Sequence, residues 1–178
     1  MKKLFSLVLA LALLLTAACA FAQGSKEEPG GGGTVVNVPE ITIKFIDDTE
    51  ASAAAIKTFA DAKEAGDILA PLPEDVRAMI PEGFGTINEM RTAQFEGEID
   101  KVTTDEFILN VMFDTPYGEG KKVVVLIGIL PETAEGEIEW KVFNGVGKAD
   151  GSVDVTVTKE IFEKVQTNPF IIGVISEE

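Results

Sequence analysis

Alternation of apolar and polar residues along short segments is the feature that most constrains the fold of this chain. Val153, Val155 and Val157 are separated by polar residues, and residues 138–142 follow the same period of two. Successive side chains of a β-strand point to opposite faces, so this pattern predicts strands with one buried and one exposed face. By contrast, Val123–Leu130 is an unbroken apolar run, which predicts a strand buried on both faces.

Turn-forming Gly, Pro, Asn and Asp residues separate these segments and set the number of elements. The patterns predict strands over residues 41–45, 87–95, 107–113, 123–130, 138–142, 153–157 and 170–175. Helices are expected over residues 51–65, 73–80 and 159–165, where Gly66, Pro81 and Pro169 mark the ends.

Short strands with closely spaced turns favour a mainly β fold, and the pattern resembles an immunoglobulin-like β-sandwich of about seven strands. The helices at about 49–80 would then be an insertion between the first two strands, and a short helix would precede the last strand. The chain lacks the Cys…Trp…Cys signature of antibody domains, so the resemblance concerns architecture alone. Alternatively, residues 34–85 form a separate small α/β unit before an all-β unit.

The first 22 residues have the order of a secretory signal peptide. Lys2 and Lys3 precede a long apolar stretch, and Ala20-Phe21-Ala22 before Gln23 fits the site of the general signal peptidase. Cleavage after Ala22 would release a secreted domain. An uncleaved membrane anchor is the alternative, because the apolar stretch is barely long enough to span a bilayer.

Residues 15–19, Leu-Thr-Ala-Ala-Cys, also resemble the lipobox of bacterial lipoproteins, with Thr16 where Leu, Val or Ile is usual. That resemblance implies a diacylated Cys19 as the first mature residue. Residues 23–33, which end in four glycines, are then expected to be a flexible linker, and residues 34–178 the folded domain. Both forms of processing predict an extracytoplasmic protein, either secreted or lipid-anchored at the cell surface.

Composition argues against several classes of function. The chain has no His and a single Cys, which excludes Ser-His and Cys-His nucleophilic pairs, zinc sites with imidazole ligands and CxxC redox sites. Its 30 acidic and 15 basic residues, a formal charge of −15, argue against nucleic acid as a partner. We therefore expect no catalytic residues, no metal and no cofactor, and membrane contact only through the leader or a lipid anchor.

A few side chains remain as candidates. Tyr117 lies in a predicted turn and is the better exposed aromatic residue for ligand contact, whereas Trp140 is in phase with apolar neighbours and is expected in the core. Glu137 and Glu139 share a strand face with Lys141, which indicates a solvated surface. The alternative interpretation is the acid pair of a glycosidase, which needs two carboxylates across a cleft.

Three functions stay open on this basis. An exported or surface-tethered bacterial module that binds or scaffolds an unidentified extracellular ligand or cell-envelope component is favoured. The alternatives are a carboxylate-dependent extracellular glycan hydrolase and a structural spacer without a dedicated ligand. A cleft with two acids would favour the hydrolase, and an apolar or aromatic patch with a polar rim would favour the binding module.

Overall fold

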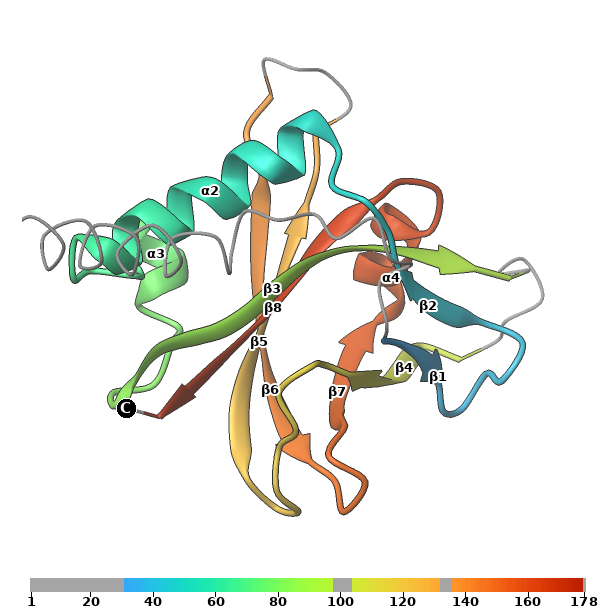
Figure 1. Cartoon of the computed structure of the whole chain (residues 1–178). Helices are drawn as coiled ribbons and strands as arrows, with labels where there is room; N and C mark the ends of the chain where they lie inside the picture. The colour runs from blue at the N-terminus through green and yellow to red at the C-terminus, as the bar shows by residue number, and fades with distance from the viewer. Residues whose placement is uncertain (1–30, 98–103, 132–135, 178) are drawn as a thin grey trace, which may run out of the picture.

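The structure, a computed structural model, describes residues 31–97, 104–131 and 136–177, and in these ranges eight antiparallel strands close into one barrel (Figure 1). The strands are β1 (Gly32–Val35), β2 (Thr42–Phe45), β3 (Phe84–Glu96), β4 (Glu106–Met112), β5 (Lys122–Ile129), β6 (Glu139–Gly147), β7 (Val153–Thr158) and β8 (Phe170–Glu177). Their order around the barrel is β1-β2-β3-β8-β5-β6-β7-β4, and β4 pairs back onto β1.

The barrel corrects the predicted immunoglobulin-like sandwich. All seven predicted strands are present, so the mainly β assignment is confirmed, but an eighth strand, β1, pairs with both β2 and β4 and joins the two ends of the sheet. Period-two patterning reports which face of a strand is buried and carries no information on whether the sheet closes. Since β1 and β2 belong to the same barrel as the later strands, the chain is not divided near residue 85.

Glycine explains why β1 was missed. The expected linker, residues 23–33, overlaps β1 at Gly32 and Gly33, which the structure places in pairing with both neighbouring strands. A Cβ atom on Gly32 would lie 2.5 Å from the carbonyl oxygen of Ile43, and one on Gly33 would lie still closer to that of Asn110. These glycines therefore permit a close approach of backbones at the seam that closes the barrel.

Apolar side chains fill the interior, and each end of the barrel is closed by a different segment. At one end α4 (Lys159–Val165), the expected helix before the last strand, inserts Phe162, whose ring stacks on Phe107 with centroids 4.1 Å apart. At the other end, the connection from β4 to β5 inserts Phe113 and Tyr117 into the same core. The interior is thus a packed core, as in other small barrels.

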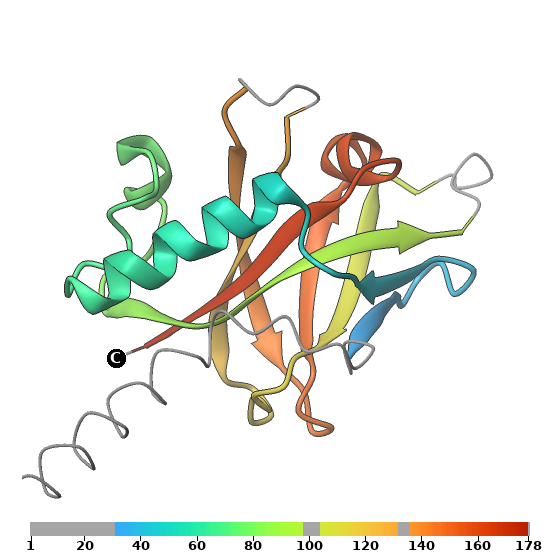
Figure 2. The same cartoon turned by 45° about the horizontal axis from the view of Figure 1, so that its top comes forward.

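The helices α2 (Glu50–Glu64) and α3 (Glu74–Arg77) lie outside the barrel, between β2 and β3 in the chain. Figure 2 shows α2 crossing the outer face of β3, β8 and β5. A second apolar cluster, which includes Phe59, Leu126 and Ile171, forms between these helices and the strands. Therefore β5 is buried on both faces, as its unbroken apolar run predicted.

Buried hydroxyl groups attach the start of α2 to β3. Thr49 caps the helix by accepting a hydrogen bond from the backbone N–H of Ser52 at 3.2 Å. The hydroxyl of Thr92 on β3 lies 2.8 Å from that of Ser52 and 2.5 Å from the carboxylate of Asp48. This network sets the position of α2 across the sheet.

The predicted leader, including Cys19 and the cleavage position after Ala22, lies outside the described residues. Among the residues that are described, no helix has the length and apolar character needed to cross a membrane.

Candidate functional site

An open groove of about 430 Å³ lies beside α2, on the helix-covered side of the barrel. Three parts of the chain form it: α2, the turn before α3, and the segment that leads into β6 together with the start of that strand. The lining residues are Ala55, Thr58 and Phe59 of α2, then Pro71, Leu72 and Pro73, and finally Glu137, Ile138 and Trp140. Both the volume and the mainly apolar lining are typical of ligand sites.

Two aromatic rings form the floor of the groove. Phe59 and Trp140 meet edge to face with their centroids 5.3 Å apart, a preferred arrangement of aromatic pairs. The ring of Trp140 lies across Gly128, its partner on β5, so closely that a Cβ there would come within 2.7 Å of it. Both aromatic residues are buried, so the floor is preformed by packing on the barrel.

The turn before α3 forms a stiff wall. Pro71 and Pro73 fix their own backbone φ angles, and Leu72 between them is buried. The backbone N–H of Leu72 also donates to the carbonyl of Leu69 at 3.0 Å. This wall is therefore held in shape before any ligand arrives.

Of the described residues that line the groove, Glu137 is the one with a charged side chain. The hydroxyl of Thr58 donates to the carbonyl of Ala54 in its own helix at 2.9 Å. Glu137 is exposed, and within the described part of the chain it takes part in no ion pair. The groove lining thus presents a carboxylate beside an apolar floor.

Glu139, two residues further along, has a different environment. Its carboxylate lies 2.8 Å from the ammonium group of Lys141 and 3.0 Å from that of Lys164. Hydrogen bonds from these two lysines lower the pKa of Glu139 below its ordinary value. The predicted face shared by Glu137, Glu139 and Lys141 is therefore divided between the groove and a surface ion cluster. Among the described residues that line it, the groove offers one carboxylate, where a glycosidase needs two.

The most buried charged group of the described residues, Glu89, lies at the end of the barrel closed by the connection from β4 to β5. Glu89 accepts hydrogen bonds from Arg91 Nε at 2.8 Å and from the backbone N–H of Asp114 at 2.9 Å, and Arg91 also pairs with Asp114. Burial opposes the charge on Arg91, but the hydrogen bond and charge of Glu89, with Asp114, raise the pKa of the guanidinium above its ordinary value. This network attaches the connection to β3.

Tyr117, the predicted ligand contact, is only 3% exposed, so the expectation that it is exposed was wrong. Its turn crosses the end of the barrel, and its ring meets Phe113 edge to face at 6.3 Å. The Tyr117 hydroxyl accepts a hydrogen bond from Asn88 at 3.4 Å. Burial, partly offset by this hydrogen bond, raises the pKa of Tyr117 above its ordinary value.

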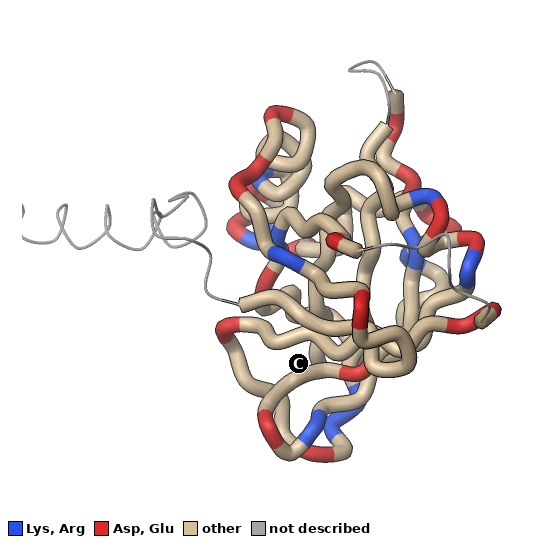
Figure 3. The backbone as a smooth tube through the Cα atoms, turned by 90° about the vertical axis from the view of Figure 1, so that its right-hand side faces the viewer, with Lys and Arg blue, Asp and Glu red and all other residues tan. Residues whose placement is uncertain are grey.

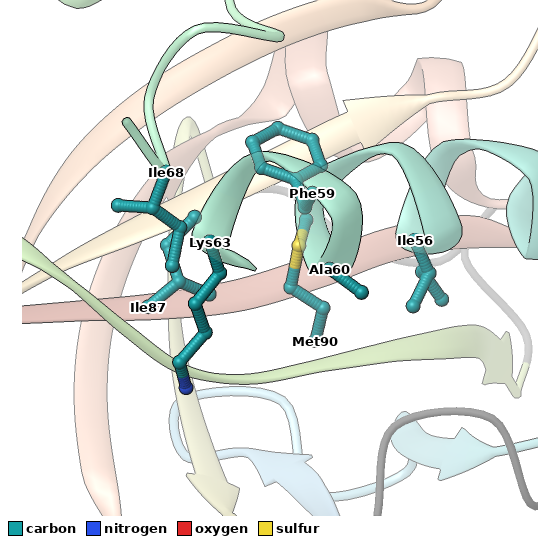
Figure 4. Close-up of a pocket in the computed structure, with 7 residues that line it drawn as sticks. All are labelled: Ile56, Phe59, Ala60, Lys63, Ile68, Ile87 and Met90. Carbon is teal, nitrogen blue, oxygen red and sulfur yellow. The ribbon is translucent and has the colours of Figure 1, made fainter. Parts of the chain in front are cut away.

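A second cavity lies directly under α2 and measures about 10 Å³ (Figure 4). Its walls are formed mainly by apolar side chains of α2, of the following turn and of β3. The labelled residues are Ile56, Phe59, Ala60, Lys63, Ile68, Ile87 and Met90. This volume is close to that of one water probe, so the cavity is a packing gap.

Acidic residues are distributed over many parts of the surface (Figure 3). Among the described residues, they form no group of three or more that could hold a metal ion. The groove therefore remains the most developed candidate site.

No protein-family model, curated protein or solved structure matches this chain.

Sequence reasoning missed this groove, although it anticipated one part correctly. Trp140 was expected in a core and is buried, but its role as the groove floor depends on Phe59, which lies 81 residues earlier in the chain (140 minus 59). The closest sequence signal was Pro71-Leu72-Pro73, an apolar turn with two rigid residues. Only the fold shows that this turn faces the start of β6.

Proposed function

We propose that this protein is an exported or surface-tethered module that binds an extracellular ligand or a cell-envelope component through the groove beside α2. The observation that carries the proposal is the open and mainly apolar groove, whose floor is preformed by the buried rings of Phe59 and Trp140, in a strongly acidic chain. An accessible apolar surface with a polar rim is the usual mark of a binding site.

Export is supported by the sequence order of the leader. We expect mass spectrometry of the protein recovered from its native cell envelope or medium to find either an acylated Cys19 or an N-terminus at Gln23. A cytosolic protein that retains Met1 would contradict this half of the proposal, whatever the groove binds.

The two alternative functions find less support in the same region. A spacer has no need of a preformed groove between a helix and a strand. A glycan hydrolase that works with two carboxylates is not favoured by a lining in which Glu137 is the one carboxylate among the described residues.

The binding half can be tested with a neutral apolar probe, N-phenyl-1-naphthylamine. We expect the probe to shift the NMR signals of residues 55–59, 71–73 and 137–140. The variant Thr58→Trp fills the groove from α2 and should abolish these shifts, because Thr58 lines the groove and is exposed.

The matched control is Ala53→Trp, which adds the same side chain at an exposed position of α2 outside the groove lining. It should bind the probe like the unaltered protein. Probe shifts that survive in Thr58→Trp, or that occur elsewhere in the barrel, would contradict the assignment of the groove as the binding site.

A further inference from the structure

We infer that the ligand of this groove is an extended peptide segment of a partner protein that carries apolar side chains next to a lysine or arginine, with Glu137 as the partner of that cation. The inference rests on the proposed binding function and adds the chemical class of the ligand.

Charge in the groove favours a cation. Glu137 is the one charged residue in the described part of the lining, and it has no ion pair with another described residue. The exposed acids Glu74 and Asp75 follow directly after Pro73 in the wall. Since the chain carries a formal charge of −15, the field around the groove attracts a basic ligand and repels an acidic one.

Glu139 and Glu137 differ in whether lysines of the same chain pair with them. Two lysines of the same chain already neutralise Glu139, whereas the carboxylate of Glu137 stands at the groove with its charge available. An incoming ammonium or guanidinium group could form with Glu137 the kind of pair that Lys141 forms with Glu139.

The apolar floor of the groove indicates that the ligand also carries apolar side chains. Phe59, Leu72 and Trp140 line the groove but are largely buried, so a ligand contacts their few accessible atoms together with the partly exposed Ala55, Pro71 and Ile138. A fully hydrophilic cation would leave this apolar part of the lining without a partner. Apolar side chains beside the cation satisfy both parts of the lining at once.

The shape favours a peptide over a small molecule. The groove is open along the surface rather than enclosed, whereas sites for small ligands bury most of the ligand surface. An extended peptide can occupy a groove that is open to the surface along its length. Aromatic residues also line the grooves that known modules use for extended peptides.

The test begins with selection of random octapeptides displayed on phage by the full chain, with counter-selection on Thr58→Trp. We expect the selected peptides to combine apolar side chains with an adjacent Lys or Arg. One selected peptide is then synthesised with its basic residue intact and with norleucine in its place, and both are measured by isothermal titration calorimetry.

The basic peptide should bind about fivefold more tightly than the norleucine peptide, as expected for a solvent-exposed ion pair of about 1 kcal/mol. Glu137→Gln should remove this difference and leave the affinity for the norleucine peptide unchanged. Glu119→Gln, at an exposed acid in the connection from β4 to β5, should preserve the difference. Added salt should reduce it in the unaltered protein.

The outcomes separate this inference from the proposed function. Equal affinity for the two peptides, or a difference that persists in Glu137→Gln, overturns the inference while binding at the groove stands. Failure of the selection to enrich any peptide, with the naphthylamine probe still bound in the groove, overturns the peptide assignment alone. If no peptide is enriched and the naphthylamine probe does not bind in the groove, the proposed function is overturned as well.

Discussion

The two halves of the barrel differ in what lies against their outer faces. On one half, α2 covers β3, β8 and β5 (Figure 2), α3 packs against β6, and β8 is buried along nearly its whole length. On the other half, β7 alternates between buried and exposed positions. The interior face is apolar on both halves, so the outer face alone accounts for the difference between a continuous and an alternating apolar pattern.

The two halves also differ in how many packed layers they have and in which features of the molecule they contain. The helix-covered half has two packed layers, and the groove lies at the margin of its outer layer. The half that α2 and α3 leave uncovered, called the bare half below, has one packed layer. Its outward residues face solvent and interact with each other, as in the hydrogen bond from Asn110 to Asp154 at 2.7 Å. It contains the seam where β1 closes the barrel.

The sharpest test of this comparison removes an outward side chain from each half. Leu126 on β5 is fully buried under α2, so Leu126→Ala should lower the free energy of unfolding by about 2–5 kcal/mol. Thr156→Ala, at an outward and exposed position of β7, should cost less than about 1 kcal/mol. Urea denaturation of both variants measures the difference, and similar losses would mean that α2 does not pack on β5.

The seam on the bare half should be sensitive to added volume. Gly33→Ala would place a Cβ atom against the backbone of β4, and such overpacking costs about 1–3 kcal/mol. Gly118→Ala is the matched control, because a Cβ atom there meets nothing within 4 Å. Hydrogen exchange should show lost protection in β1 and β4, and unchanged protection there would indicate that β1 does not close the barrel.

The smallest effect concerns the ionisation of Tyr117, which closes one end of the barrel. Burial raises its pKa, so the native state retains the phenol proton more strongly than the unfolded chain does. The corresponding stability is complete below the unfolded pKa of about 10 and is lost as the pH rises through the native value.

Because Tyr117 is the single Tyr in the chain, phenolate absorbance reports on it alone. Its midpoint should lie above that measured in urea. Equal midpoints would place the ring in solvent and remove the closure of this end by Tyr117.

Patterns in the sequence correctly predicted those features of the fold that depend on residues close together in the chain. The period of two in 153–157 and the apolar run 123–130 identified β7 and β5 and even their burial. The closure of the barrel escaped prediction because Gly32 and Gly33 carry no side chains and so no pattern. Tyr117 was misplaced because its Pro- and Gly-rich turn has the composition of a surface loop, while its burial depends on strands distant in the sequence.

The candidate site was less predictable than the fold for the same physical reason. Phe59, Leu72 and Trp140 each occupy an apolar position that core packing explains equally well. Their position together along the lining of one groove depends on the angle at which α2 crosses the sheet, which the buried contact of Ser52 with Thr92 helps to set. No pattern along the chain encodes that angle.

The placement of Trp140 across Gly128 has a practical consequence. The chain contains no other Trp, so its intrinsic fluorescence originates from one indole at the meeting point of barrel, helix and groove. Quenching or a spectral shift of that emission will register an arriving molecule without any label, and a red shift during heating will signal the detachment of α2 from the strands.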